Sequence, residues 1–271
     1  MRLRVGDVEV ASYVVDPAVD PRHGPRPFLH PVRTLGGRTV TDAGPADHPW
    51  HLGVSVAMQD VAGSNLWGGR TYVRDQGYTW RADHGAIVHD GFDREDADGF
   101  AERLRWCDPA GATLLHEERA VSAAAAPPYG WELSFDYRLT APGADVALGS
   151  PATNGRPGGA GYGGFFWRAA PGTYTVFDDT AADASEDAVN GSAAAWVALA
   201  GAYTLVFSGL SGDDRWFVRT GIYPGVCAAL AFTRPLTVSA GAPVERGLRV
   251  LVADGALDRA AVRAYRGGFG R

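Results

Sequence analysis

The sequence contains no lysine, and all 25 of its basic residues are arginine. Chemistry that forms a Schiff base through a lysine amine is therefore excluded, and so is the lysine of a phosphate-binding P-loop. These absences exclude pyridoxal-phosphate enzymes, Schiff-base aldolases and ordinary P-loop nucleotide hydrolases. A GxSxG motif is also missing, so the chain lacks the nucleophile elbow of an α/β-hydrolase.

Cysteine, basic runs and an apolar leader are scarce or missing as well. Cys107 and Cys227 are too few for a disulfide framework, which favours a reducing cytoplasm. The first residues, MRLRVGDVEVAS, carry charges of both signs where an export signal needs an apolar core, so we expect no export signal. The net charge of −6, without any basic cluster, argues against a nucleic-acid partner.

One uncharged run, from Ala188 to Gly212, is long enough to span a bilayer. Glycine and serine residues interrupt it, and the basic or aromatic flanks of a membrane anchor are missing. Its central part, WVALAGAYTLVFSG, divides into two strands around Ala200-Gly201-Ala202. We therefore predict a β-hairpin here and no membrane partner.

The rest of the chain also has the pattern of strands. Short alternating segments such as HLGVSVAM, GFAERLRW and GWELSFDYRL are separated by turn residues. Only DGALDRAAVRAYRG, near the end, has the four-residue spacing of a helix. A composition that is 46% hydrophobic over 271 residues supports a sizeable core. We predict one all-β sandwich domain over residues 1–271, with one short C-terminal helix.

The segment DHPWH, Asp47 to His51, concentrates ionisable and aromatic residues. Pro49 disfavours a helix here, and on a strand His48 and His51 would point to opposite faces, so only a turn would bring them together. Three interpretations stay open: a packed structural turn, a metal site, and an acid/base or substrate-binding site. Because zinc and related metals need three or four ligands and only two histidines lie close in sequence, we predict no metal and no cofactor.

Two later segments combine aromatic rings with polar side chains. GSNLWGGR contains Asn65, Trp67 and Arg70, and GYGGFFWR contains Tyr162 and Arg168. This mixture is typical of sugar sites, where apolar C–H faces stack on rings and hydroxyls take directed hydrogen bonds. An aromatic-rich edge strand explains the first segment equally well. Arg168 either clamps a carboxylate, phosphate or hydroxyl pair, or pairs with a neighbouring acid.

The segment LLHEERAV alternates charged residues along one predicted strand. His116 and Glu118 share one face, and Glu117 and Arg119 share the other. An acid beside a histidine is a candidate general base, but charge alternation on a solvent-facing strand is the commoner explanation and the one that we expect.

Taken in order, GPADHPWHLG, GSNLWGGR and GYGGFFWR resemble the motifs of bacterial proteins labelled PmoA family proteins. These proteins carry a DHPxH signature, then a Gly-x-Asn-phi-Trp segment in which phi is apolar, then a Gly-Tyr-Gly-Gly motif. The resemblance covers most of the chain and implies a galactose-mutarotase-like β super-sandwich associated with sugar catabolism. Trp50 stands where many relatives have a further histidine. The signature positions are Asp47, His48, His51, Asn65, Trp67, Tyr162 and Arg168.

The sequence therefore predicts a cytoplasmic enzyme that acts on a sugar or oxidised sugar by epimerisation, mutarotation or glycosidic cleavage through proton abstraction. His48 or His51 is the expected acid/base, and Asp47 is expected to orient one of them. The expected substrate-binding residues are Asn65, Trp67, Arg70, Tyr162 and Arg168. Two alternatives stay open: a non-catalytic carbohydrate-binding protein, and a metal-dependent oxygenase or lyase.

Overall fold

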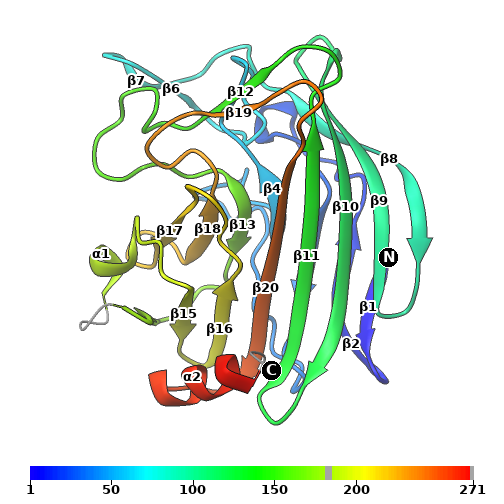
Figure 1. Cartoon of the computed structure of the whole chain (residues 1–271), viewed down its shortest axis with the longest axis vertical. Coiled ribbons are helices and arrows are strands. Elements are labelled where there is room, and N and C mark those ends of the chain that lie inside the picture. Colours follow the sequence, from blue (N-terminus) through cyan, green and yellow to red (C-terminus); the bar gives the residue numbers. More distant parts are fainter. Residues whose placement is uncertain (181–184, 269–271) are drawn as a thin grey trace.

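Two large antiparallel sheets pack face to face in the computed structural model, which describes residues 1–180 and 185–268 (Figure 1). The seven-stranded sheet has the order β1 (Arg2–Val5), β2 (Val8–Val14), β3 (Phe28–Val32), β4 (Val54–Ala57), β13 (Gly164–Arg168), β18 (Gly225–Ala229), β17 (Arg215–Arg219). The eight-stranded sheet has the order β14 (Thr175–Asp178), β15 (Trp196–Ala200), β16 (Tyr203–Ser208), β20 (Val244–Asp254), β11 (Gly130–Thr140), β10 (Thr113–Ala126), β9 (Gly99–Cys107), β8 (Ala86–Glu95).

Smaller elements lie at the two ends of the sandwich. Two short sheets lie at the upper end of Figure 1: β19 (Leu236–Val238), β12 (Val146–Gly149) and β5 (Asp60–Val61), and the pair β6 (Thr71–Val73) and β7 (Gly77–Thr79). The helical elements are a 3₁₀ turn, Pro21–His23, the single turn α1 (Glu186–Val189), and α2 (Arg259–Gly268). The predictions of an all-β sandwich and of a short C-terminal helix are confirmed. Within the described residues, every helix is too short or too polar to cross a membrane.

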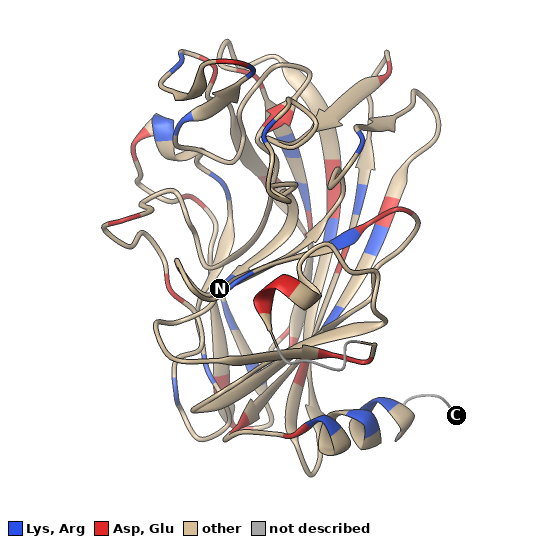
Figure 2. Cartoon of the chain, turned by 90° about the vertical axis from the view of Figure 1, so that its left-hand side faces the viewer, with Lys and Arg blue, Asp and Glu red and all other residues tan. Residues whose placement is uncertain are grey.

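The uncharged run of residues 188–212 contains the predicted hairpin. Strands β15 and β16 pair in antiparallel register from Trp196–Ser208 to Ala200–Thr204, and every residue of both strands is buried. One face of this hairpin packs in the main core between the large sheets, and the other packs against α2. Because both faces are covered, the strands read as a continuous apolar run, which explains their likeness to a membrane segment. Three arginines, Arg259, Arg263 and Arg266, lie along α2 (Figure 2), and the guanidinium carbon of Arg259 lies 5.7 Å from the Phe177 ring centroid.

The expected solvent-facing charge alternation in β10 is present on one face only. His116 and Glu118 are exposed, but Glu117 and Arg119 are buried between the sheets. Arg119 Nε donates to Glu117 at 2.7 Å, and its Nη1 donates to the Tyr13 hydroxyl at 2.8 Å. A buried carboxylate and guanidinium tolerate removal from water only when they are paired and hydrogen-bonded in this way.

The outer face of the seven-stranded sheet carries a second apolar cluster. Strand register aligns Ser55, Phe166, Cys227 and Phe217 in one row across β4, β13, β18 and β17. Successive residues of a strand point to opposite faces, so Trp167 faces the main core while Phe166 faces outward. Loops bury this outward row. The covering segments are residues 43–53, 65–70 and 149–163.

Candidate functional site

The segment DHPWH forms two consecutive turns on this outer face. His48 N–H donates to the Pro45 carbonyl at 3.0 Å, and His51 N–H donates to the His48 carbonyl at 2.9 Å. A backbone bridge between Ala43 and Leu52 closes the loop. The turn stacks the rings of His48 and His51, with centroids 4.6 Å apart and planes inclined by 20°. The turn geometry that would bring the two histidines together is therefore present.

Asp47 orients the first of these histidines. Its Oδ2 lies 2.8 Å from His48 Nδ1. This hydrogen bond, followed by weaker effects that include Arg168, holds the pKa of Asp47 below its usual range. An ionised carboxylate only accepts hydrogen bonds, so Nδ1 carries the hydrogen and Nε2 is the nitrogen of His48 left to act on a ligand.

His51 lies in a different environment, with 2% of its surface exposed. Its ring packs against Phe166 at 5.0 Å and Tyr223 at 4.7 Å between centroids. Within the described residues, its buried Nδ1 has no hydrogen-bond partner. Burial, then the nearby charges of His48, Arg168 and Arg26, hold the pKa of His51 well below its usual value. We therefore expect a neutral imidazole at pH 7 beside an imidazole tied to a carboxylate.

We expect this lowered pKa to make the folded protein less stable in acid. In the unfolded chain His51 takes up a proton near pH 6.5, whereas the folded state resists it, so the stabilisation present above that pH is lost as the pH falls toward the folded-state pKa. The wild type should lose up to about 1.4 kcal/mol per pH unit more than His51→Gln below pH 6.5.

Urea denaturation of both proteins from pH 7.5 down to pH 4.5 measures this difference. Burial also lowers the pKa values of His23 and His30. These two residues are the same in both proteins, so the difference in slope isolates His51. Parallel stability curves would contradict a lowered pKa at this position.

A cavity of about 400 Å³ opens beside the stacked histidines. Both His48 and His51 line it, as do three arginines, Arg70, Arg156 and Arg219. Its remaining lining is mainly aromatic and includes Trp50, Trp67, Trp80, Tyr78, Tyr162 and Tyr223. A second hollow, of about 620 Å³ on the eight-stranded sheet, has neither histidine nor tryptophan in its lining. Of these two, the first cavity is the one that places histidines among tryptophan rings.

The Asn65 side chain shapes the loop that carries Trp67. It is fully buried, and its Oδ1 accepts the backbone N–H groups of Trp67 at 3.0 Å and Gly68 at 2.8 Å. Its Nδ2 donates to Thr71 Oγ1 at 2.9 Å. Two of these contacts hold the loop backbone and the third holds the Thr71 hydroxyl, and Asn65 lies behind the cavity lining.

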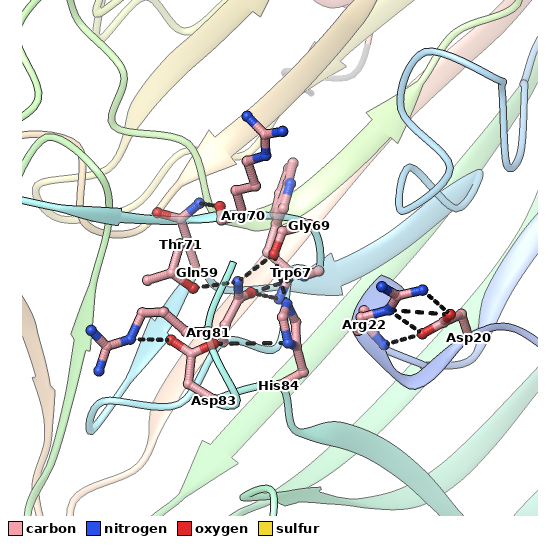
Figure 3. A network of polar contacts seen from close by, with 12 residues as sticks. Asp20, Arg22, Gln59, Trp67, Gly69, Arg70, Thr71, Arg81, Asp83 and His84 are labelled. Atoms are coloured by element: carbon pink, nitrogen blue, oxygen red, sulfur yellow. Dashed lines mark hydrogen bonds and ion pairs between the residues drawn. The ribbon is translucent and has the colours of Figure 1, made fainter. Parts of the chain in front are cut away.

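Gly69 allows the same loop to approach Trp50 closely. Its φ is +72°, and a Cβ built on it would lie 2.6 Å from the Trp50 ring. A side chain is therefore excluded here by both conformation and space. His84 Nε2 donates to the Gly69 carbonyl at 2.6 Å, and Asp83 lies 3.8 Å from the other ring nitrogen of His84 (Figure 3).

Arg26 joins this loop to the DHPWH turn. Its guanidinium is fully buried and donates to the carbonyls of Trp50 at 3.0 Å and Trp67 at 3.1 Å. It also donates to the Gly24 carbonyl at 2.8 Å and to Ser55 Oγ at 3.0 Å. Burial lowers the pKa of Arg26 to about 9, which leaves it positively charged at neutral pH.

Gln59 begins a chain of hydrogen bonds that reaches the cavity. Its Oε1 accepts a backbone N–H of β6 at 3.3 Å, and its Nε2 donates to a carbonyl just before β6 at 3.2 Å, which fixes the amide orientation. Nε2 therefore donates to the Tyr162 hydroxyl at 2.7 Å, while Arg156 donates to the Tyr78 hydroxyl at 2.6 Å.

The two tyrosine hydroxyl oxygens lie 2.9 Å apart. Burial raises the pKa of both Tyr78 and Tyr162, so both keep their hydrogens at neutral pH. One hydroxyl hydrogen lies between the two oxygens, and each oxygen already accepts from Arg156 or Gln59. The remaining hydroxyl hydrogen is therefore left to be donated to a ligand.

Not all of the residues expected from the sequence reach the cavity. The lining includes His48, His51, Trp67, Arg70 and Tyr162. Asp47 acts on the cavity through His48.

Arg168 lies behind the lining, like Asn65. Its Nη2 is 3.8 Å from Asp42 and 4.0 Å from Asp47, and its guanidinium carbon lies 4.9 Å from the Tyr223 ring centroid. Of the two readings of Arg168, pairing with neighbouring acids is the one that this geometry favours. Within the described residues, its Nε and Nη1 have no hydrogen-bond partner.

Several residues of the site were not predicted from the sequence, among them Arg26, Arg156, Arg219 and Tyr223. Arg156 lies in the glycine-rich loop before β13, where an arginine among flexible residues was its only signal. Arg219 and Tyr223 belong to β17 and the turn that follows it. No sequence pattern connects these segments with DHPWH, because strand pairing through β13 and β18 is what joins them.

Metal ligation was one of the three interpretations of the histidine pair. In the part of the chain that the structure describes, no three His, Cys, Asp or Glu side chains gather as metal ligands. The absence of a metal from the working protein stays a prediction, and so does the resemblance to PmoA family proteins.

Among solved structures, the chain is similar to heparan sulfate lyase HepC from Pedobacter heparinus, with 9% sequence identity and a TM-score of 0.31. A mutant of the same lyase gives a TM-score of 0.30 at the same identity. Each comparison covers 82% of this chain, which spans 30% of the lyase chain. No curated protein matches the chain. A family model described as "Family of unknown function (DUF6807)" matches residues 1–266, and the chain belongs to that family.

Proposed function

We propose that the chain is an enzyme that acts on a sugar or oxidised sugar by histidine acid/base catalysis. The observation that carries the proposal is the stacked pair of His48 and His51 beside an aromatic cavity. One ring is tied to the Asp47 carboxylate, and burial keeps the other neutral. Neighbouring titratable groups whose environments push them into different states are typical of acid/base sites.

In this proposal His48 Nε2 accepts a proton from a C–H or O–H group of the sugar. The Asp47 carboxylate stabilises the imidazolium that forms. His51 stays neutral, because a second positive charge on a ring stacked at 4.6 Å would be repelled. A second donor completes each reaction, and the spare hydroxyl hydrogen of the Tyr78–Tyr162 pair is the candidate. Protonation of the carbanion on its opposite face gives epimerisation, and protonation of the ring oxygen as its bond to the anomeric carbon breaks opens the ring for mutarotation. In glycosidic cleavage by elimination, the C–H electron pair forms a C=C bond while the leaving oxygen takes the donor's proton.

We assign substrate contact and positioning to different residues. Trp80 is the candidate stacking surface, because it lines the cavity and is 48% exposed, whereas Trp67 is only 1% exposed. Asn65 and Arg168, which lie behind the lining, are positioning residues. The first holds the Trp67 loop and the second lies beneath Tyr223 and beside Asp47.

Hydrogen exchange in D₂O tests the proposal directly. We expect at least one monosaccharide or 3-keto-glycoside that changes the tryptophan fluorescence of the protein to show catalysed deuterium uptake, anomer exchange or cleavage by NMR. Catalysed exchange should disappear in His48→Gln. A sugar that binds without any of these reactions would support the non-catalytic alternative instead. Stoichiometric metal in the purified protein, lost together with activity in His51→Ala, would support the metal-dependent alternative.

A further inference from the structure

We propose that the ligand of this cavity is a sugar that carries an anionic group, either a carboxylate or a phosphate or sulfate ester, which Arg70 and Arg156 bind. The inference rests on the proposed function and specifies its substrate class.

The lining of the cavity is positively charged. Three arginines belong to it and no aspartate or glutamate does. Arg219 lies 3.6 Å from Glu186, which compensates one of the charges. Within the described residues, neither Arg70 nor Arg156 has a carboxylate oxygen within 4.0 Å. The whole chain has 31 acidic residues against 25 arginines, so this cationic lining runs against its overall charge.

Two further guanidinium groups lie beneath the lining. Arg26 is compensated only by carbonyl and hydroxyl oxygens, and Arg168 lies 3.8 and 4.0 Å from the carboxylates of Asp42 and Asp47. Asp47 is shared with His48. The positive potential of the cavity is therefore not cancelled from below, and buried charges act strongly because little water screens them. An anionic ligand supplies the missing negative charge.

Arg156 and the tyrosine pair form a suitable contact for an oxyanion. Arg156 uses Nη1 on the Tyr78 hydroxyl, and its guanidinium carbon lies 4.8 Å from the centroid of the Tyr78 ring. The rest of its planar fork stays available for a carboxylate, phosphate or sulfate. Of the two hydroxyl hydrogens of Tyr78 and Tyr162, the one that does not lie between their oxygens is a neutral donor beside this cation.

Arg70 brings a second cation next to the candidate stacking surface. Its guanidinium carbon lies 6.0 Å from the centroid of the Trp80 ring, and both residues line the cavity. A sugar ring that stacks on Trp80 would thus have its charged substituent within reach of an arginine. A neutral sugar would leave both cations without a partner.

Binding of matched probes to the full chain tests the inference. Methyl β-glucuronide and methyl β-glucoside differ only at the carboxylate, and glucose 6-phosphate and glucose 6-sulfate carry the two ester groups. We expect at least one charged probe to bind about 10- to 100-fold more tightly than methyl β-glucoside by titration calorimetry, because hydrogen bonds to charged groups are the strong ones. Comparing the three charged probes identifies the anionic group.

Variants then assign the preference to the two arginines. Arg70→Met and Arg156→Met should each reduce the charged-to-neutral preference by about tenfold, measured as the ratio of the two affinities within each variant. Arg138→Met, on the eight-stranded sheet, removes the same charge elsewhere and should keep the full preference.

Each other outcome overturns something definite. Equal affinity for charged and neutral probes overturns the anionic assignment, and so does a preference that survives both cavity variants. In either case, reaction of a sugar in D₂O would still support the proposed function. Binding of inorganic sulfate without binding of any sugar probe overturns the proposed function instead. Failure of every probe to bind overturns the anionic assignment, and exchange of monosaccharides and 3-keto-glycosides in D₂O then decides the proposed function separately.

Discussion

Replacing His48 by glutamine should lower turnover of the sugar by about 10²–10⁴-fold and change its dissociation constant by no more than about threefold. General acid/base groups contribute this much to rate and little to ground-state binding. Glutamine keeps a side-chain donor toward Asp47 but cannot accept a proton from the substrate. Steady-state kcat, with binding measured separately by calorimetry, checks the split.

Two further variants test whether the effect is specific to the Asp47–His48 pair. Asp47→Asn should lower kcat in the same direction, because the carboxylate fixes the His48 tautomer at 2.8 Å and stabilises its protonated form. His116→Gln, on an exposed position of β10, should leave both quantities unchanged. A rise in KM at constant kcat for His48→Gln would contradict its role as the base.

Removal of the stacking surface should weaken sugar binding and leave kcat nearly unchanged, the opposite of the pattern expected for His48→Gln. Trp80→Ala should weaken binding about fivefold with kcat nearly constant, since aromatic contacts act on ground state and transition state alike. Trp67 is a poor choice for this comparison. It is packed against Tyr162 and Phe166, each at 4.8 Å, so its truncation should destabilise the fold by about 3–5 kcal/mol.

The sequence predicted the elements whose determinants are local. The hairpin of β15 and β16 follows from two apolar runs around a small-residue turn, and α2 follows from four-residue spacing before the chain ends. The association of His48 with His51 also arises locally, because two consecutive turns from Pro45 to His51 bring the rings together where a strand would separate them. These features need no information about distant segments.

Features that depend on distant partners were not predictable from the sequence. Arg119 is adjacent to exposed charges in β10, and only its contacts with Glu117 and Tyr13 explain why it is buried. The same holds for Arg26, whose acceptors come from three separate segments. Asn65 and Arg168 occupy the signature positions that imply substrate contact, yet their partners are backbone groups and acids behind the lining. The motifs identified Asn65 and Arg168 as residues of the site but did not show which groups they contact.

Replacing Arg26 by methionine should lower the free energy of unfolding by about 3–5 kcal/mol, because four neutral acceptors lose a charged hydrogen-bond donor at once. Methionine matches the length of the aliphatic stem but has no donor. The carbonyls of Gly24, Trp50 and Trp67 and the hydroxyl of Ser55 would then lose the guanidinium that satisfies them. Buried acceptors without partners cost about 1–3 kcal/mol each, less where water enters.

The loss should extend to the cavity, because Trp50 and Trp67 lie on separate loops that Arg26 holds together. We expect Arg26→Met to bind sugar at least tenfold more weakly under conditions where it is still folded. Arg22→Met is the matched control. Arg22 is close to Arg26 in sequence, but its side chain is exposed and paired with Asp20 (Figure 3). The urea midpoint of this variant should therefore equal that of the wild type. A loss of stability below about 1 kcal/mol in Arg26→Met would mean that water replaces the guanidinium with little cost. In that case the two loops would be held by their aromatic packing and by Asn65 rather than by Arg26.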